Sequence, residues 1–255
     1  MSFVLRLWSS VIRRAERSLV LEEVDPQTGY DLWSATYDAD EAGNPVLSLD
    51  RATLETYLPP LKGQGVLDMA CGTGHYAMQA ASAGARLAVG IDRSAGMLRQ
   101  ARDKAVERRT PVALVQAEQS RLPLASTSLD VVVHALGASY TRDLGPLAGE
   151  LARVLRPGGT ALVSDLHPQG VQRGWRRTFS YYCGTRRQAI LKTYGHRMEE
   201  YRVAFEQAGL SIANLVEPCV DEALRPCFAA AGAPTRYEQL VHQPLLVVFE
   251  LQRSG

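Results

Sequence analysis

The chain has 255 residues, with 28 basic and 27 acidic side chains and a formal net charge of +1. This balance gives no general attraction to nucleic acid or to an anionic membrane surface. Four cysteines occur without C-x-x-C spacing, which argues against a disulfide framework or zinc site and favours a reducing cytoplasm. No cluster has metal-ligand spacing, so a catalytic metal is not expected. The length suits one globular domain, or a core domain with a small cap.

The first 58 residues are expected to form N-terminal helices and a lid. Apolar residues recur at helical spacing from Val4 to Leu19, with arginines between them. We expect this helix to pack on the domain or on a second subunit, which leaves a homodimer open. A membrane-surface helix or a transit peptide is the alternative, but no apolar run has membrane-spanning length, so stable insertion is not expected. Residues 25–46 are predicted to be a lid, and 48–58 a helix.

From residue 59 onward, short apolar runs alternate with helical patterns. Strands are predicted at 65–69, 87–91, 112–115, 129–135, 160–164, 211–216 and 244–251, and helices at about 75–84, 94–108, 143–155 and 196–207. The alternation predicts an α/β fold, a doubly wound, Rossmann-like, seven-stranded and mostly parallel sheet with helices on both faces. Ligands of such sheets bind at the carboxyl ends of the strands.

Two acidic residues lie at the carboxyl ends of the first two of these strands. Asp68 precedes a glycine turn at Gly72-Thr73-Gly74, and Asp92 lies 18 residues after Gly74. The glycines let the backbone approach a ligand closely. In dinucleotide-binding proteins such a loop holds a pyrophosphate, which Asp68 would repel. A ligand with a ribose, an ammonium group and no phosphate fits better, and S-adenosylmethionine (AdoMet) is such a ligand.

These segments resemble a known family. Asp68 to Gly74 (DMACGTG) is similar to the first motif of the class I AdoMet-dependent methyltransferases, and Ile91 to Leu98 to the second. Glu118 to Val133 and Leu155 to Gly159 resemble two later motifs in the correct order. Tyr30 to Asp38 resembles the lid of small-molecule members, near the ubiquinone/menaquinone C-methyltransferase type with a methyltransferase type 11 domain. The resemblance also implies that the last strand runs antiparallel to its neighbours.

The resemblance implies a cofactor site for AdoMet. Its predicted residues are Tyr30, Tyr37, Asp68, Ala70, Gly72, Gly74, Asp92, Arg93, Met97, Glu118 and Gln119. Asp68 would bind the methionine ammonium and Asp92 the ribose hydroxyls. Met97 would pack on the adenine, with the protein core as the alternative. Family members often carry Asp where this chain has Glu118, so direct contact of Glu118 with the adenine amino group is less certain.

Three histidines follow predicted strands or the glycine loop on the ligand side. Imidazole suits a base that works near neutral pH, and His167 is the preferred candidate, with Asp165 as an orienting or substrate-binding acid. His134 and His75 are the alternatives. A lone histidine is more often structural, so each assignment stays open.

Residues 169–195 are predicted to be a cap insertion in the 59–255 methyltransferase domain. The segment has six basic side chains, no acidic one and several aromatic ones, a composition suited to a flat or anionic acceptor. Trp175, Arg176 and Arg177 are the predicted acceptor-binding residues, with an ordinary solvated insertion as the alternative.

The predicted function is methyl transfer from AdoMet to a small, anionic or aromatic acceptor. Methylation of RNA or protein, or a non-catalytic AdoMet-binding regulator, are the alternatives; nucleic acid is not an expected partner.

Overall fold

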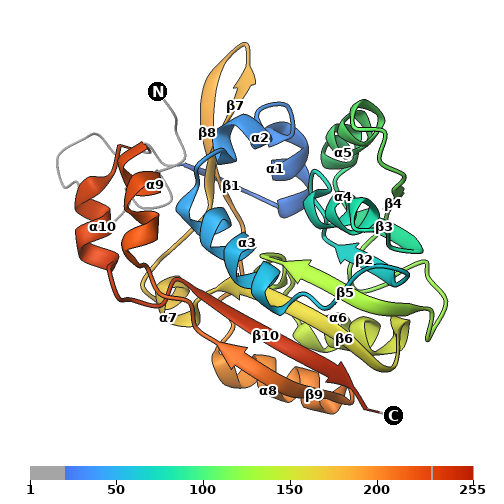
Figure 1. Cartoon of the computed structure of the whole chain (residues 1–255). Helices are drawn as coiled ribbons and strands as arrows, with labels where there is room; N and C mark the ends of the chain where they lie inside the picture. The colour runs from blue at the N-terminus through green and yellow to red at the C-terminus, as the bar shows by residue number, and fades with distance from the viewer. Residues whose placement is uncertain (1–20, 231, 255) are drawn as a thin grey trace.

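The computed structural model describes residues 21–230 and 232–254 and contains a seven-stranded sheet in the order β4-β3-β2-β5-β6-β10-β9 (Figure 1). Its strands are β2 (Gly65–Met69), β3 (Leu87–Asp92), β4 (Ala113–Gln116), β5 (Leu129–Ala135), β6 (Leu155–Leu166), β9 (Leu210–Val216) and β10 (Leu246–Arg253). The strands β2 to β6 pair in parallel, whereas β10 runs antiparallel to β6 and β9. The predicted fold class is confirmed, and so is the antiparallel last strand.

Helices cover both faces of this sheet, which explains why its strands are apolar at consecutive positions. They are α3 (Pro45–Tyr57), α4 (His75–Ser82), α5 (Ala95–Glu107), α6 (Leu144–Val154) and α8 (Met198–Gln207). Neighbouring residues of β5 belong to different cores. Val132 packs in the cluster that contains α6 and α8. Val133 packs with Leu54 of α3 and Tyr76 of α4 on the other face.

The strand β6 begins earlier than the sequence predicts. Leu155 already pairs with Leu129 of β5, and the register then shifts so that Thr160 pairs with Val131. The stretch 156–159, part of the segment that resembles a later family motif, is therefore an irregular stretch of the strand. Gly158, at φ +76°, takes a backbone conformation that favours glycine.

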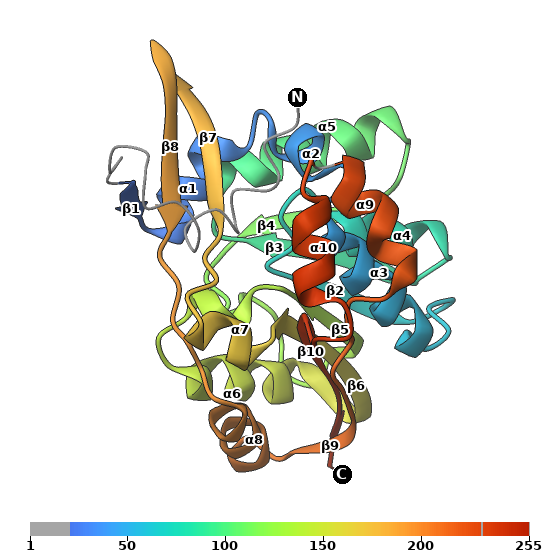
Figure 2. The ribbon, with the colours of Figure 1, turned by 90° about the vertical axis from the view of Figure 1, so that its left-hand side faces the viewer.

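A second, three-stranded sheet carries the lid helices α1 (Pro26–Trp33) and α2 (Tyr37–Glu41). It consists of β1 (Glu22–Val24), β8 (Thr185–Leu191) and β7 (Thr178–Cys183), and α7 (Pro168–Gln172) precedes it. Residues 169–195, which the sequence predicts to be a cap insertion, consist mainly of the β7–β8 hairpin, which projects beyond the helices in Figure 2. The helix α1 lies very close to it, because a Cβ added to Gly29 would come 2.2 Å from Leu191 Cδ2.

Three short elements between β9 and β10 are missing from the sequence prediction. They are η4 (Glu222–Leu224), α9 (Arg225–Ala230) and α10 (Pro234–Leu240). Phe228 of α9 and Tyr237 of α10 form a buried cluster with Val46 and Leu47 of α3, and Figure 2 shows both helices beside α3. Helices this short carry too few periodic positions for a pattern to show.

The helix expected between Val4 and Leu19 lies outside the described residues. In the described ranges, no helix combines the length and the apolar character needed to cross a membrane.

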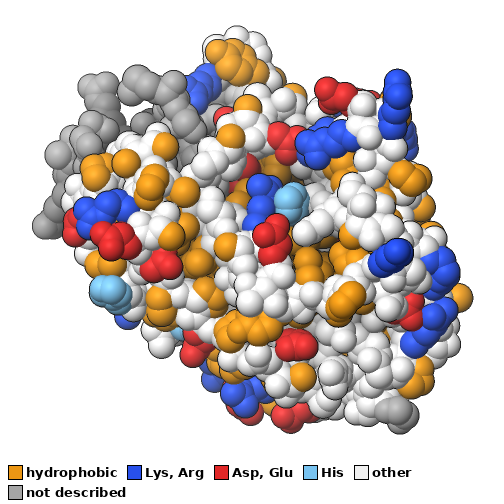
Figure 3. Space-filling view, viewed as in Figure 1, with side chains coloured by type: hydrophobic (Ala, Val, Ile, Leu, Met, Phe, Trp, Pro, Cys, Tyr) orange, Lys and Arg blue, Asp and Glu red, His pale blue; other side chains and the backbone are white. Residues whose placement is uncertain are grey.

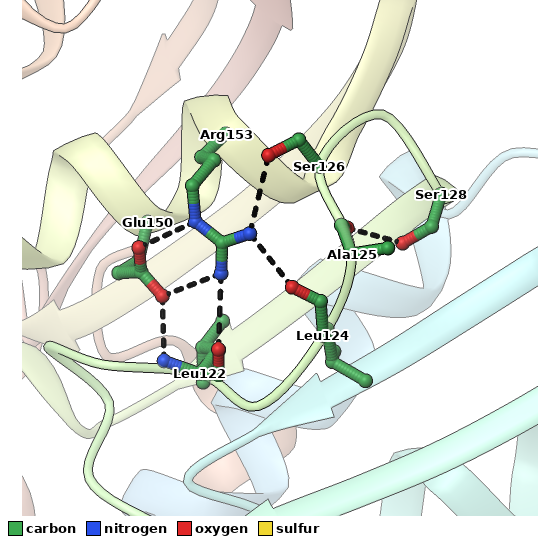
Figure 4. A network of polar contacts seen from close by, with 7 residues as sticks. All are labelled: Leu122, Leu124, Ala125, Ser126, Ser128, Glu150 and Arg153. Carbon is green, nitrogen blue, oxygen red and sulfur yellow. Dashed lines mark hydrogen bonds and ion pairs between the residues drawn. The ribbon is translucent and has the colours of Figure 1, made fainter.

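An arginine on α6 holds the long connection between β4 and β5 in place. Arg153 donates to the carbonyl oxygens of Leu122 and Leu124 and to Ser126 Oγ (Figure 4). Its guanidinium also pairs with Glu150, whose carboxylate accepts the Leu122 N–H at 2.5 Å. This network fixes a connection that has no helix of its own.

We predict that Arg153→Ala lowers the free energy of unfolding by about 1–2 kcal/mol, because several charge-assisted hydrogen bonds are lost at a partly screened site. Urea unfolding measures the loss, and amide hydrogen exchange should accelerate in residues 118–128. Arg156→Ala is the matched control, since Arg156 pairs with Asp130 at an exposed position. An equal loss in both variants would contradict a special role for Arg153.

Candidate functional site

A cavity that opens to solvent, with about 1200 Å³ of space when the open part is included, lies at the carboxyl ends of β2, β3 and β5, the edge at which parallel sheets bind ligands. Its wall includes Asp68 of β2 and Ala70 just after that strand, Asp92 at the end of β3 and Arg93 just after it, and Leu136 after β5. Figure 3 shows a hollow near the middle of this face, with basic, acidic and histidine side chains around it.

The glycine loop after β2 has an unusual backbone. Gly72 and Gly74 have φ values of +52° and +83°, and Ala70, which is not a glycine, has φ 59°. Asp68 is 2% exposed, and its Oδ2 accepts the N–H of Ala77 at 2.9 Å. Burial, with a smaller contribution from the neighbouring Asp92, raises the pKa of Asp68 to about 7. A ligand cation at this place would favour the ionised carboxylate.

Asp92 ties the two ligand loops together. One oxygen accepts the N–H of Gly72 and the other accepts the N–H of Ser94, both at 2.8 Å. Burial raises the pKa of Asp92. Because a carboxylate oxygen has two lone pairs, Asp92 can still accept from two hydroxyl groups of a ligand. The Gly72 N–H points to Asp92, so it is not offered to a pyrophosphate, which argues against the dinucleotide alternative.

The lid helices are bonded to both loops. Asp31 of α1 accepts from Ser94 Oγ at 2.6 Å and from the Gly96 N–H at 2.7 Å. Asp38 of α2 accepts from Thr73 Oγ1 at 2.7 Å in the glycine loop. The lid is therefore positioned by the same loops that form the cavity floor.

Aromatic side chains and one buried cation form the lid side of the cavity. Tyr30 donates to Tyr140 at 2.9 Å, and their rings meet edge to face with that of Tyr37 nearby. Arg177 of the cap forms an ion pair with Glu41 of α2 at 2.5 Å and lies over the ring of Trp33. This pair joins the cap to the lid above the cavity.

The far end of the cavity contains Glu118 and Gln119. Glu118 forms an ion pair with Arg93 at 3.4 Å. Gln119 Oε1 accepts a hydrogen bond from His134 Nε2 at 2.8 Å, and the Gln119 amide N–H donates to the Gly137 carbonyl at 3.3 Å. These contacts fix both side chains at the cavity wall.

The structure brings most of the predicted cofactor residues to this cavity. Tyr30, Tyr37, Asp68, Ala70, Gly72, Asp92, Arg93, Glu118 and Gln119 line it. Gly74 and Met97 do not. Gly74 begins α4, where a side chain would meet Ala101 Cβ at 3.2 Å. Met97 is 1% exposed and packs in the protein core. The core is the alternative that the sequence left open for this residue.

The predicted bases are less well placed. His167 is outside the cavity wall: its Nε2 bonds Glu217 at 2.8 Å and its Nδ1 accepts from the Gln169 N–H. His134 is fully buried behind Gln119, and burial lowers its pKa to about 4. Asp165 accepts from the Ser139 N–H and the Tyr201 hydroxyl in a smaller adjoining pocket. Of the three histidines considered, His75 lines the cavity.

The predicted acceptor residues divide between the two pockets. Trp175 and Arg176 line the smaller pocket, whereas Arg177 lines both. Arg176 donates to the carbonyl oxygens of Val171 and Trp175. Both acceptors belong to residues 169–195, so Arg176 is hydrogen-bonded within its own segment.

Sequence reasoning missed several cavity residues. They are Asp50 and Arg51 of α3, Tyr76 of α4, and Leu136 and Tyr140 after β5. The signal available for Asp50 is a carboxylate on the apolar face of a helix, three residues after Leu47 and four before Leu54, both of which are buried. Leu136 carries a second sign of a site, because its φ is 55°.

Comparison with known proteins identifies the family. Residues 66–159 match the model of a methyltransferase domain. A demethylmenaquinone methyltransferase from Thermus thermophilus is 32% identical over 69% of this chain and 76% of its own length. The chain belongs to the class I AdoMet-dependent methyltransferases. A biotin biosynthesis bifunctional protein from Cellvibrio japonicus is 34% identical over 58% of this chain, but the match spans only 29% of that protein.

Solved structures agree with this assignment at the level of fold. An S-adenosylmethionine-dependent methyltransferase from Mesorhizobium loti superimposes with a TM-score of 0.65 at 22% identity, over 80% of this chain and 98% of the other. The cofactor of the methyltransferase is AdoMet, and two buried carboxylates in the cavity wall fit its ammonium and ribose. In the described part of the chain, no group of three or more His, Cys, Asp or Glu side chains is arranged to hold a metal ion.

We predict a bell-shaped pH dependence of AdoMet affinity. Below pH 7, Asp68 of the free enzyme holds a proton that the ligand ammonium must displace, so the Kd should rise about tenfold per pH unit. Above about pH 7.7–8.0 the ligand's own amino group loses its proton, and affinity falls again. Calorimetry between pH 5.5 and 9 measures both limbs. Asp68→Asn should bind weakly and lose the acidic limb; a wild-type Kd that is flat from pH 5.5 to 7 would contradict the assignment.

We predict that Asp92→Ala weakens AdoMet binding about 100-fold or more, because a charged acceptor of two ribose hydrogen bonds and the tie between two loops are both removed. Asp130→Ala is the matched control. Its carboxylate also accepts a backbone N–H, from Gly65 at 2.7 Å, but at the other end of the sheet. Calorimetry should show near-normal affinity in the control, and normal affinity in Asp92→Ala would exclude ribose binding by this residue.

Proposed function

We propose that this methyltransferase transfers its methyl group to a small acidic or aromatic acceptor that enters the cavity beside AdoMet. The observation that carries the proposal is the continuity of the cavity. The same space that reaches Asp92 and Glu118 extends past the tyrosines of the lid to Asp50, Arg51 and Tyr76. It therefore has room for a second ligand next to the cofactor.

The order of the strands indicates on which side of AdoMet the acceptor would bind. AdoMet, with its ribose at Asp92 of β3 and its ammonium at Asp68 of β2, would lie across these two strand ends. The next strands are β5 and β6, so the methyl group would face the ends of β5 and β6 and the helix α3 above them. In-line displacement at the methyl then needs an acceptor held at this end, and such positioning supplies much of the rate.

The walls of this end suit an aromatic or anionic acceptor. The rings of Tyr37, Tyr76 and Tyr140 provide apolar surface with polar tips. Arg51 stands exposed at the cavity wall, where its guanidinium can pair with a carboxylate or phosphate. The name of the Thermus relative, a demethylmenaquinone methyltransferase, is consistent with an aromatic acceptor here.

RNA and protein are the alternative class of methyl acceptor. Basic and acidic side chains are interspersed on the face around the hollow (Figure 3), and the net charge is +1. A polyanion would need a continuous basic surface and would bind with a steep dependence on salt. The distribution of charge favours the small acceptor.

The test is transfer of a labelled methyl group from AdoMet. The purified enzyme is incubated with hydroxyaryl carboxylates, quinols, amines and thiols, and separately with RNA and with unfolded protein. We expect label on small acidic aromatic acceptors. Label on RNA or protein alone would refute the proposal.

We predict that Arg51→Gln raises the KM of an anionic acceptor about tenfold, because an Arg–carboxylate pair is lost at a partly solvated site. The KM of AdoMet and of an uncharged acceptor should change less than twofold. Arg102→Gln, an exposed substitution on α5 away from the cavity, is the matched control. Equal losses for charged and uncharged acceptors would contradict the role of Arg51.

A further inference from the structure

A buried carboxylate lies in the wall of the cavity at the acceptor end. Asp50 belongs to α3 and is 1% exposed. Its Oδ1 accepts from Ser164 Oγ of β6 at 2.5 Å, and its Oδ2 accepts from the Tyr76 hydroxyl of α4 at 3.0 Å. Each oxygen keeps a second lone pair for another donor. The carboxylate is thus held by three elements, with acceptor capacity left.

The hydrogen bonds connect Asp50 to the strand end nearest the methyl group. The N–H of Leu136 donates to Ser164 Oγ at 3.3 Å, and Ser164 in turn donates to Asp50. Leu136 lies in the cavity wall and has the left-handed φ of 55°. A Cβ added to the next residue, Gly137, would come 3.1 Å from Ala70 Cβ in the glycine loop. Asp50 is therefore positioned relative to the loops that would hold AdoMet.

The charged and titratable groups around Asp50 come from its own helix and from two neighbours. Arg51 on α3 and the hydrogen bonds from Ser164 and Tyr76 lower its pKa, whereas Asp165 on β6 raises it. Burial is the largest effect, and the resulting pKa is about 6. Across residues 21–230 and 232–254, no Lys, Arg or His lies within ion-pair distance of this carboxylate.

We propose that Asp50 is the general base that takes the proton of the acceptor, and that the acceptor reacts through a hydroxyl group. This proposal rests on the proposed function. In the step, the acceptor oxygen forms a bond to the methyl carbon while the sulfur–methyl bond breaks. The electron pair of that bond neutralises the sulfonium and gives the thioether. The O–H proton passes to the Asp50 carboxylate and later to water, so charge and atoms balance.

A hydroxyl acceptor is one class that needs such a base. A thiol ionises near pH 8.5 without help, and an uncharged amine attacks with its lone pair and loses its proton afterwards. A hydroxyl group is a poor nucleophile until its proton is withdrawn, and a positioned base contributes about 10²–10⁴-fold. A buried carboxylate beside the methyl position supplies that base.

His75 is the competing base in the cavity wall. Burial and the nearby charges of Arg51, Lys104 and Arg108 together lower its pKa to about 4, while Asp38 acts in the opposite direction. A base is most effective when its pKa is near the working pH. His75 is therefore the weaker proton acceptor, and its uncharged ring is suited to hydrogen bonding.

The decisive variant is Asp50→Asn, compared with Glu55→Gln on the same helix. Glu55 is exposed and does not line the cavity. At saturating AdoMet, with a hydroxyaryl carboxylate as acceptor, we expect kcat of Asp50→Asn to fall about 10²–10³-fold. Its AdoMet Kd should change less than twofold, and Glu55→Gln should match the wild type. Asp50→Glu should recover part of the rate.

The pH profile separates a base from a structural carboxylate. Wild-type kcat should fall below about pH 6, and Asp50→Asn should lack this limb. The hydroxyls of Tyr76 and Ser164 lower the pKa of Asp50, so Tyr76→Phe and Ser164→Ala should move the acidic limb to higher pH. Saturating AdoMet removes the separate effect of Asp68 on cofactor binding. A ¹³C NMR titration of the Asp50 carboxyl group gives the same pKa without any acceptor.

Several outcomes would overturn the proposal. They are normal kcat in Asp50→Asn, loss of AdoMet binding in that variant, an acidic limb that disappears in His75→Gln instead, or turnover of amines and thiols alone. Transfer to RNA or protein alone would refute the proposed function itself. The wild-type acceptor screen therefore distinguishes the two failures.

Discussion

Desolvated carboxylates at the ends of adjacent parallel strands are the constraint on which this site depends. Burial opposes the charge of Asp68 and Asp92, and an unpaired buried charge is costly. The fold compensates with backbone N–H groups: Asp68 accepts from Ala77 of α4, and Asp92 accepts from Gly72 in the glycine loop and from Ser94 after β3. Those bonds fix the glycine loop and the loop after β3 relative to each other. The stability of the loops and the affinity for a cationic ligand thus have one electrostatic origin.

The lid extends the same arrangement. Asp31 and Asp38 accept from donors near those two loops, so the lid helices are oriented by the floor of the cavity as well as by the hydrophobic cluster that Trp33 forms with Phe179 and Leu191. The ion pair between Glu41 of α2 and Arg177 then connects the lid to the segment 169–195. Since a buried ion pair loses stability when one partner is removed, lid and cap should respond together to a change at either residue.

The sheet and the cofactor end could be predicted because their information is local. Apolar runs bounded by turns gave β2 to β5 within a residue or two, and Asp68 and Asp92 stand at strand ends that the pattern marks. The acceptor end could not be predicted, because it depends on contacts between residues that are far apart in the sequence. Asp50 meets Ser164 across 114 residues, and His167 turns toward Glu217, 50 residues away. Proximity to a strand end in sequence did not reveal which way that histidine faces.

The pairing of β1 with β8 has a consequence for how the molecule forms. Glu22–Val24 pair in parallel with Ala189–Leu191, so this small sheet joins segments that are far apart in the chain. Closing so large a loop is entropically unfavourable until other contacts hold its ends, and non-local pairings form slowly. The large sheet from β2 to β6 consists of sequential units and can form first. We expect the β1–β8 pairing to come late in folding, after the strand ends beneath the lid are in place, and to open first when the protein is stressed.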